Sequence, residues 1–215
     1  MSVKIFFSCL LLCIDSVISP AHSQIERHYS LSGLLKKNQL VTKPSRQTQI
    51  LENSLPGAIS TKGLIWCKGI RFTEGTIDID LRGKNVFLQS FLGIAFHGVD
   101  TTTYEVVYFR PFNFRHADTL RRKWSVQYMS LPDYDYDKLR KEHPLVYENS
   151  VTPVPEPDDW FHATIVIRED RITVYVNHST EASLQVKKLN KLNTGKVGLW
   201  ADGLSGDFAN LTITQ

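Results

Sequence analysis

The stretch TIDIDL, residues 76–81, alternates apolar and acidic side chains along its whole length. Successive side chains of a β-strand point to opposite faces, so the two isoleucines and Leu81 share one face, and Asp78 and Asp80 share the other. This period of two predicts a strand with one face in a core and one face in water. The stretch therefore favours an antiparallel sheet.

Two hairpins are expected in the residues that follow this strand. Residues 86–97 and 104–112 flank a short polar connector, and residues 163–167 and 172–176 flank a charged turn. Three more strands are expected at residues 184–189, 195–200 and 208–213. The main helical stretch is residues 137–142, between two prolines. The pattern predicts an all-β fold, a two-sheet antiparallel jelly-roll sandwich with one short helix in a loop.

The N-terminus has the layout of a secretory signal. Lys4 precedes the apolar residues 5–14, and small residues follow near Ser23. The apolar run is too short for a membrane span, which needs roughly 20 residues. A lipid anchor at Cys13 is disfavoured, because Leu12 stands where a small residue is expected. We predict a signal peptide at residues 1–23, an N-terminal extension at 24–48, a sandwich domain at 49–215, and export to the periplasm or the cell exterior.

Cysteine content and charge restrict the chain further. Without the signal peptide Cys67 is the remaining cysteine, so no internal disulfide forms and stability must come from a core of about 190 residues. Its apolar neighbours predict a buried thiol. The net charge of +3 is mild and predicts no nucleic-acid partner. The basic run at residues 121–123 is expected in a solvated loop.

The sequence lacks the common enzyme signatures, including Gly-x-Ser-x-Gly and His-Glu-x-x-His. Residues 133–137 alternate acids like a calcium loop, but Lys138 replaces the glycine that such a loop needs. A polar loop that caps a helix explains this stretch better. No motif predicts a cofactor, and calcium or another divalent metal stays an option without support from a motif.

The first hairpin carries the candidate site. If His97 pairs with Tyr104, one face combines small residues with side chains that stack on sugar rings and bind hydroxyl groups. The predicted ligand-binding residues are His97, Tyr104, Tyr108, Arg110, Asn113, Gln127 and Tyr128. Glu105 falls on the core side, where it is either a catalytic acid or a member of a structural ion pair.

Several segments resemble a known family. They are residues 105–114 (EVVYFRPFNF), 124–128 (WSVQY), 159–162 (DWFH), 172–177 (ITVYVN), and the closing pair 195–200 (GKVGLW) and 207–211 (DFANL). The chain from about residue 49 to the end is similar to concanavalin A-like lectin/glucanase domains of exported bacterial proteins, especially laminin-G-like and keto-disaccharide-hydrolase-like modules.

This resemblance implies a jelly-roll sandwich with a carbohydrate partner. The chain departs from the sandwich glucanases, because Asp78 and Asp80 are not completed to their Glu-x-Asp-x-Glu motif. A lectin-like carbohydrate-binding domain is therefore the favoured function. The alternatives are a glycoside hydrolase or lyase and a laminin-G-like protein-interaction module.

Overall fold

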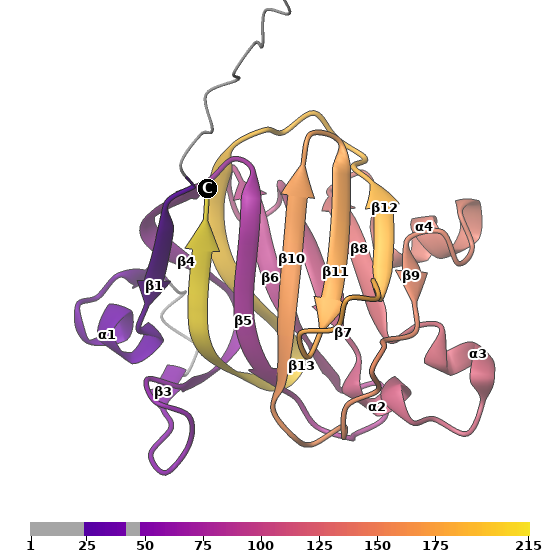
Figure 1. Cartoon of the computed structure of the whole chain (residues 1–215), viewed down its shortest axis with the longest axis horizontal. Coiled ribbons are helices and arrows are strands. Elements are labelled where there is room, and N and C mark those ends of the chain that lie inside the picture. Colours follow the sequence, from indigo (N-terminus) through magenta and orange to yellow (C-terminus); the bar gives the residue numbers. More distant parts are fainter. Residues whose placement is uncertain (1–23, 42–47) are drawn as a thin grey trace, which may run out of the picture.

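The structure is a computed structural model that describes residues 24–41 and 48–215, so the predicted signal peptide lies outside the described residues (Figure 1). The strands are β1 (Glu26–Tyr29), β2 (Leu40–Val41), β3 (Thr48–Ile50), β4 (Ile59–Phe72), β5 (Gly75–Arg82), β6 (Ser90–Gly98), β7 (Tyr104–Phe109), β8 (Val126–Leu131), β9 (Glu148–Asn149), β10 (Phe161–Arg168), β11 (Arg171–Val176), β12 (Leu184–Lys187) and β13 (Gly195–Thr214). The helices are α1 (Leu31–Lys36), α2 (Pro111–Phe114), α3 (Thr119–Arg122) and α4 (Tyr136–Glu142).

The strands form two stacked layers (Figure 1). Layer A runs in the order β12, β11, β10, β5 and the C-terminal half of β13, and β1 pairs with the end of that strand. Layer B runs in the order β9, β8, β7, β6 and the N-terminal half of β13, with β4 and β2 beyond it. All pairings are antiparallel, which confirms the predicted all-β sandwich.

Two long strands, β4 and β13, connect the layers. β13 pairs with β6 through residues 196–203 and with β5 through residues 207–214, and its pairing with β4 shifts between Ala201 and Gly206. At this bend Gly203 has φ 74°, a conformation that glycine adopts without steric cost. The two separate strands predicted at 195–200 and 208–213 are therefore one bent strand, because the turn residues between them mark a bend inside a continuous strand.

The core lies between the layers and follows the period-two pattern of the strands. On β5, Ile77, Ile79 and Leu81 are fully buried, while Asp78 and Asp80 face outward, as predicted. Both predicted hairpins are present as β6–β7 and β10–β11. Cys67 is a buried free thiol, and burial raises its pKa to about 12. It fills space in the core as a small apolar side chain.

The N-terminal segment joins the sandwich directly. β1 pairs with β13 from Glu26↔Thr214 to Tyr29↔Leu211, and β2 pairs with β4 at Leu40↔Cys67. Between them, α1 begins at the N-cap Ser30, whose hydroxyl accepts a hydrogen bond from a backbone N–H of the first turn. Residues 26–41 are thus part of the sheet edge.

Three short helices, α1 and the single-turn helices α2 and α3, depart from the sequence-based expectation of one helix. α2 follows β7 directly, and α3 occupies part of the basic run predicted as a loop, with Asp118 as its N-cap. Each contains four residues, about one helical turn, so neither carries a readable period. Of the helices in the described part of the chain, none is long and apolar enough to cross a membrane.

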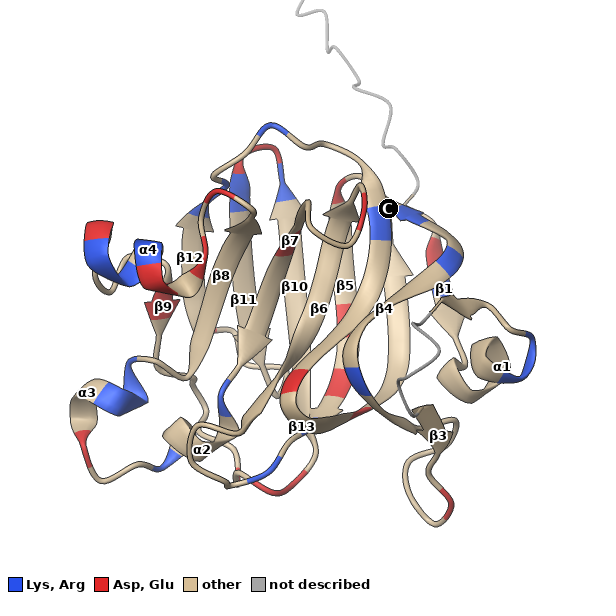
Figure 2. Ribbon diagram, turned by 180° about the vertical axis from the view of Figure 1, so that it is seen from behind, with Lys and Arg blue, Asp and Glu red and all other residues tan. Residues whose placement is uncertain are grey.

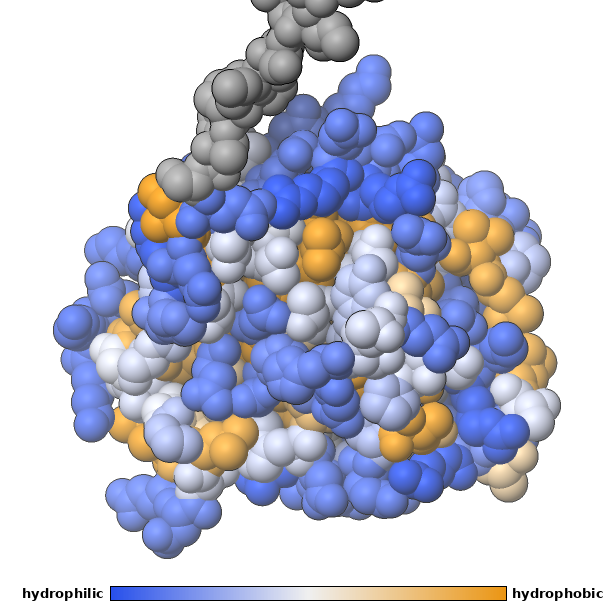
Figure 3. Space-filling model, in the orientation of Figure 1, coloured by the Kyte–Doolittle hydropathy of each residue, from blue (hydrophilic) through white to orange (hydrophobic). Residues whose placement is uncertain are grey.

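The two outer faces of the sandwich differ. The face of layer A is mostly hydrophilic to intermediate, with scattered apolar groups (Figure 3). Seen from behind, the strands of layer B carry few charged residues, and the charges gather on α3, α4 and the strand ends (Figure 2). A second hydrophobic cluster covers this outer face of layer B, and Leu139 of α4 packs against it.

Candidate functional site

The candidate site lies on the outer face of layer B, where the β6–β7 hairpin has the predicted register. Gly93 pairs with Tyr108 and Phe96 with Glu105, the alignment expected from a His97–Tyr104 pairing. Tyr104, Val106 and Tyr108 belong to the outer cluster, whereas Val107 and Phe109 belong to the core between the layers. The predicted separation of the two hairpin faces is confirmed for these residues.

One row of paired residues crosses the whole layer and sets the geometry of the site. From β4 to β9 it consists of Leu64, Trp200, Gly93, Tyr108, Gln127 and Glu148. Gly93 has no side chain, so the rings of its two neighbours in the row meet above it, with centroids 5.1 Å apart. The absence of a side chain at one position thus places Trp200 against Tyr108.

Two adjacent pockets line this face and share Trp200 and Asp202; together we call them the groove. The first pocket has a volume of about 370 Å³ and the second about 510 Å³. Both volumes fall in the range of small-molecule sites, roughly 300–1,000 Å³. The groove is therefore large enough for a ligand that contacts both sides of Trp200.

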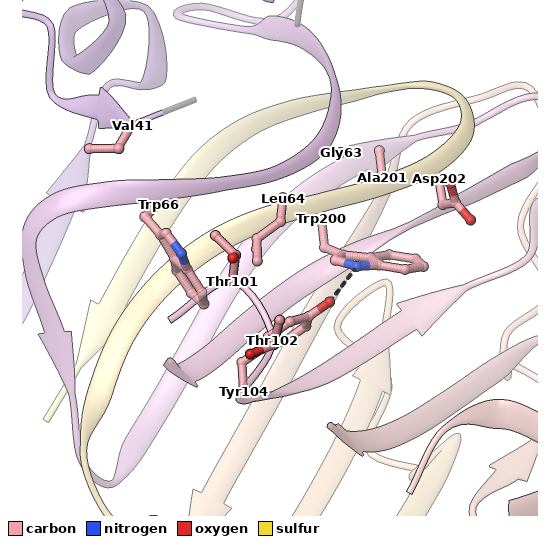
Figure 4. A pocket seen from close by; sticks show the side chains of 10 residues that line it. All are labelled: Val41, Gly63, Leu64, Trp66, Thr101, Thr102, Tyr104, Trp200, Ala201 and Asp202. Carbon is pink, nitrogen blue, oxygen red and sulfur yellow. Dashed lines mark hydrogen bonds between the residues drawn. The ribbon is translucent and has the colours of Figure 1, made fainter. Parts of the chain in front are cut away.

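The first pocket is lined by aromatic side chains (Figure 4). The indole N–H of Trp200 donates to the Tyr104 hydroxyl over 3.3 Å, and Tyr104 meets Trp66 edge to face with centroids 5.9 Å apart. Trp66 is 6% exposed, and its indole N–H has no hydrogen-bond partner. This N–H is enclosed by protein atoms, so Trp66 contributes its ring to the pocket wall and not its donor.

The second pocket has a polar wall held by hydrogen bonds. Tyr108 donates to the side-chain oxygen of Gln127 over 2.7 Å, and Arg110 donates to both groups through Nη2. Burial raises the pKa of Tyr108 to about 12, so its hydroxyl keeps its proton and remains a donor. The guanidinium of Arg110 lies over the Tyr108 ring, 4.8 Å from the centroid. The structure thus brings these three predicted residues together; Tyr108 and Arg110 line the pocket, and Gln127, which is buried, lies behind them.

His97 does not face the groove, contrary to the prediction. β6 contains a bulge there, because Gly98 pairs with Lys196 but Ala95 pairs with Gly198, and His97 has φ 49°. The extra residue reverses the alternation and turns the imidazole into the core, where its exposure is 0%. Period-two reasoning cannot detect such a bulge.

Glu105 lies in the same interior network, also with 0% exposure. Its Oε2 is 2.6 Å from His97 Nδ1, and its Oε1 accepts a hydrogen bond from Tyr128. His97 Nε2 donates to the Thr73 carbonyl over 2.8 Å, and Lys188 Nζ is 3.8 Å from Glu105. Of the two roles left open by the sequence, this placement matches the structural ion-pair member and not a residue of the groove.

Tyr128 and Asn113 also differ from the expected arrangement. Tyr128 neighbours Gln127 on a regular strand, so it must point to the opposite face, and it lies in the core between the layers. Asn113 is 2% exposed and donates to the Trp124 carbonyl over 3.1 Å, the same carbonyl that Arg110 Nη1 contacts. Asn113 therefore supports the position of Arg110 from behind the groove.

Sequence reasoning missed several groove residues, chiefly Trp66, Trp200 and Arg140. Each tryptophan stands between two apolar residues that are expected in the core, so alternation would have placed both rings on the outer face. Arg140 sits on α4, and only the packing of that helix across layer B brings it to the pocket.

The acidic loop before α4 serves as a helix cap, as the sequence analysis favoured. Asp135 is the N-cap, and its carboxylate accepts a hydrogen bond from the Lys138 backbone N–H over 2.9 Å. Within residues 24–41 and 48–215, no three or more His, Cys, Asp or Glu side chains are grouped to hold a metal ion.

The sequence matches no protein-family model, and no curated protein matches it. Solved structures do match. The carbohydrate-binding module CBM66 from Bacillus subtilis has a TM-score of 0.54 at 12% identity, over 78% of this chain and 94% of the module. A Bacillus subtilis protein of unknown function with a galectin-like fold has a TM-score of 0.51 at 11% identity, over 80% and 89%.

The exoplasmic/lumenal domain of VIP36, in its Ca²⁺/Man3GlcNAc-bound form, has a TM-score of 0.50 at 13% identity, over 81% of this chain and 85% of that domain. Identities this low are evidence for the fold alone. The strand order, the two layers and these neighbours agree with one another. The chain therefore has the concanavalin A-like jelly-roll fold.

Proposed function

We propose that the chain is a carbohydrate-binding domain whose ligand lies in the groove across Trp200. The observation that carries the proposal is the first pocket, where the rings of Trp66, Tyr104 and Trp200 line one cavity together with the polar residues Thr101, Thr102 and Asp202. Sugar rings present apolar faces to aromatic side chains and hydroxyl groups to polar atoms, so a pocket with both features suits them. The similarity to CBM66, which is named as a carbohydrate-binding module, supports the same class of ligand.

Trp200 is the central element of this proposal. It borders both pockets, and its ring is positioned by Tyr104 through a hydrogen bond and by Tyr108 through ring contact. A ring held in this way loses little conformational freedom when a ligand stacks on it. The affinity from a few stacked rings and polar contacts falls in the millimolar to micromolar range, about −4 to −8 kcal/mol.

The test is a glycan array followed by calorimetric titration of the best oligosaccharide. Trp200→Ala removes about 1.5–3 kcal/mol of apolar contact and should weaken binding about 10- to 150-fold. Trp160→Ala is the matched control, because Trp160 packs under Arg82 and does not line the groove pockets. Unchanged affinity in Trp200→Ala would remove the groove as the binding site.

The hydrolase alternative is tested in the same experiment. The carboxylates that line the groove include Asp135 and Asp202, and Asp135 is engaged as a helix cap. Oligosaccharides are incubated with the wild type and with Asp202→Asn, and new reducing ends are measured. Binding without turnover supports the lectin-like function. Turnover that Asp202→Asn abolishes would replace it with a glycoside-acting enzyme.

A further inference from the structure

Two guanidinium groups lie together in the second pocket. Arg110 follows the end of β7, and Arg140 projects from α4, which lies across the outer face of layer B. Arg110 is 4% exposed, whereas the side chain of Arg140 is 34% exposed. One positive charge is therefore fixed deep in the pocket wall and the second is open to solvent.

One buried carboxylate contacts both groups. Glu148 accepts from Arg140 Nε over 3.2 Å and from Arg140 Nη2 over 2.8 Å, and its Oε2 lies 3.6 Å from Arg110 Nη1. Its side chain is 2% exposed, so its charge acts mainly on these two partners. Among these three buried or partly buried groups, two guanidinium charges face one carboxylate, so the wall that they form is cationic.

The remaining contacts of Arg110 position its guanidinium group without neutralising its charge. Its hydrogen-bond acceptors Trp124 O, Tyr108 and Gln127 are all uncharged. Burial lowers the pKa of Arg110, because the charged form has lost hydration, but arginine remains protonated in proteins. A desolvated and incompletely balanced cation gains most from an anionic ligand.

Two acidic residues also line this pocket, and both are engaged or exposed. Asp135 caps α4, and Asp202 is an exposed residue beside Trp200, where the two pockets meet. Exposed charges are screened by salt within about 8–10 Å, whereas partly buried ones are screened much less. The pocket thus has a cationic wall of partly buried groups and two exposed acids, whose charges are screened by solvent.

We propose that this end of the groove binds the carboxylate of an acidic sugar, so that the ligand is an oligosaccharide with uronate residues. The inference rests on the proposed function and narrows it. A sugar ring against Trp200 would direct its carboxylate toward Arg140 and Arg110, whose planar forks match carboxylate geometry. A neutral sugar would leave the excess charge of this wall unpaired.

The test uses the full chain and trimers of galacturonate, mannuronate and glucuronate, each paired with its methyl ester, which has the same rings without the charge. Calorimetry at two salt concentrations gives both affinities. We expect at least one acid to bind about ten-fold or more tightly than its ester, as a charge-assisted hydrogen bond implies, and more weakly at high salt. The ratio of acid to ester within one protein is independent of the folded fraction.

Three variants locate the effect. Arg140→Gln should reduce the preference for the acid at least about five-fold, and Arg140→Lys should keep much of it, because the charge remains. Arg171→Gln removes the same charge from an exposed position on β11 of layer A and should leave the ratio unchanged.

Equal binding of every acid and ester, with neutral oligosaccharides still bound, would overturn this inference and leave the proposed function intact. A preference for acid that Arg140→Gln does not alter would also overturn it. If no sugar binds, both proposals fail.

Discussion

Replacing Glu105 with alanine tests whether this residue belongs to the core or to the site. The change removes the acceptor of Tyr128 and the anion facing His97 and Lys188, all of which are buried around Glu105. Breaking a buried ion pair by removing one partner costs about 3–5 kcal/mol. At about 2–4 °C per kcal/mol for a domain of this size, the melting temperature should fall by about 6–20 °C.

Glu105→Gln is the more informative variant. The amide oxygen can still accept from Tyr128, and the amide N–H can donate to Nδ1 of a neutral His97, whose Nε2–H remains on the Thr73 carbonyl. The negative charge that faced His97 and Lys188 is lost, and Lys188 Nζ lies 3.8 Å from it. We expect a loss of about 1–3 kcal/mol, smaller than for alanine.

The assay is urea unfolding followed by tryptophan fluorescence, with oligosaccharide binding measured on the folded protein. Glu181→Ala, at an exposed position, is the control and should change stability by less than about 0.5 kcal/mol. An alanine variant within about 1 kcal/mol of the wild type would refute the reasoning. So would a glutamine variant with wild-type stability that has lost binding or turnover, since Glu105 would then act on the ligand.

Two further predictions concern the outer faces. Partial burial opposes the charged form of His162, but its hydrogen bonds to Asp78 and Asp80 outweigh burial and raise its pKa from 6.5 to about 9. The pKa is raised on folding, so the stabilisation is complete below pH 6.5 and is lost as the pH rises through about 9. After allowance for solvent screening, this stabilisation is about 1–2 kcal/mol. His162→Gln should flatten the decline of the unfolding free energy with pH, measured by urea unfolding. An equal decline in the variant would contradict the assignment of this pH dependence to His162. Gly98→Ala would place a methyl group 2.2 Å from the Trp66 ring, so the indole must shift. Oligosaccharide binding, measured by calorimetric titration, should then weaken. Binding equal to that of the wild type would show that the position of the ring is irrelevant.

Much of the fold could be predicted because alternation is a local property. The spacing of Ile77, Ile79 and Leu81 assigns the faces of β5 without knowledge of any other strand. The β6–β7 hairpin has a short connector, so its register is also nearly local, and Tyr104 and Tyr108 follow from it.

The sequence-based predictions fail where the orientation or the neighbours of a residue depend on a bulge, a bend or tertiary packing. None of these changes the alternation of apolar and polar residues. A bulge turned His97 inward, and the bend near Gly203 joined two expected strands into one. Arg140 reaches the groove through the packing of α4, and Trp66 reaches Trp200 because β4 and β13 pair across more than a hundred residues of chain. Such contacts are decided by tertiary structure, and a single sequence gives them no distinct pattern.

The alternation that made the hairpin readable also separates stability from binding within it. Glu105 is buried on the core side of β7, while Tyr104 and Tyr108 of the same strand position Trp200 in the groove. Core substitutions act through cavities and unpaired charges, whereas groove substitutions also remove contacts to a ligand. Trp200→Ala should therefore act mainly on affinity, with a stability loss from its contacts to Tyr104 and Tyr108, and Glu105→Gln should lower stability at nearly constant affinity. A layer with one sealed face and one binding face requires this difference between the two variants. Each strand of layer B contributes alternate residues to the core face and to the groove face.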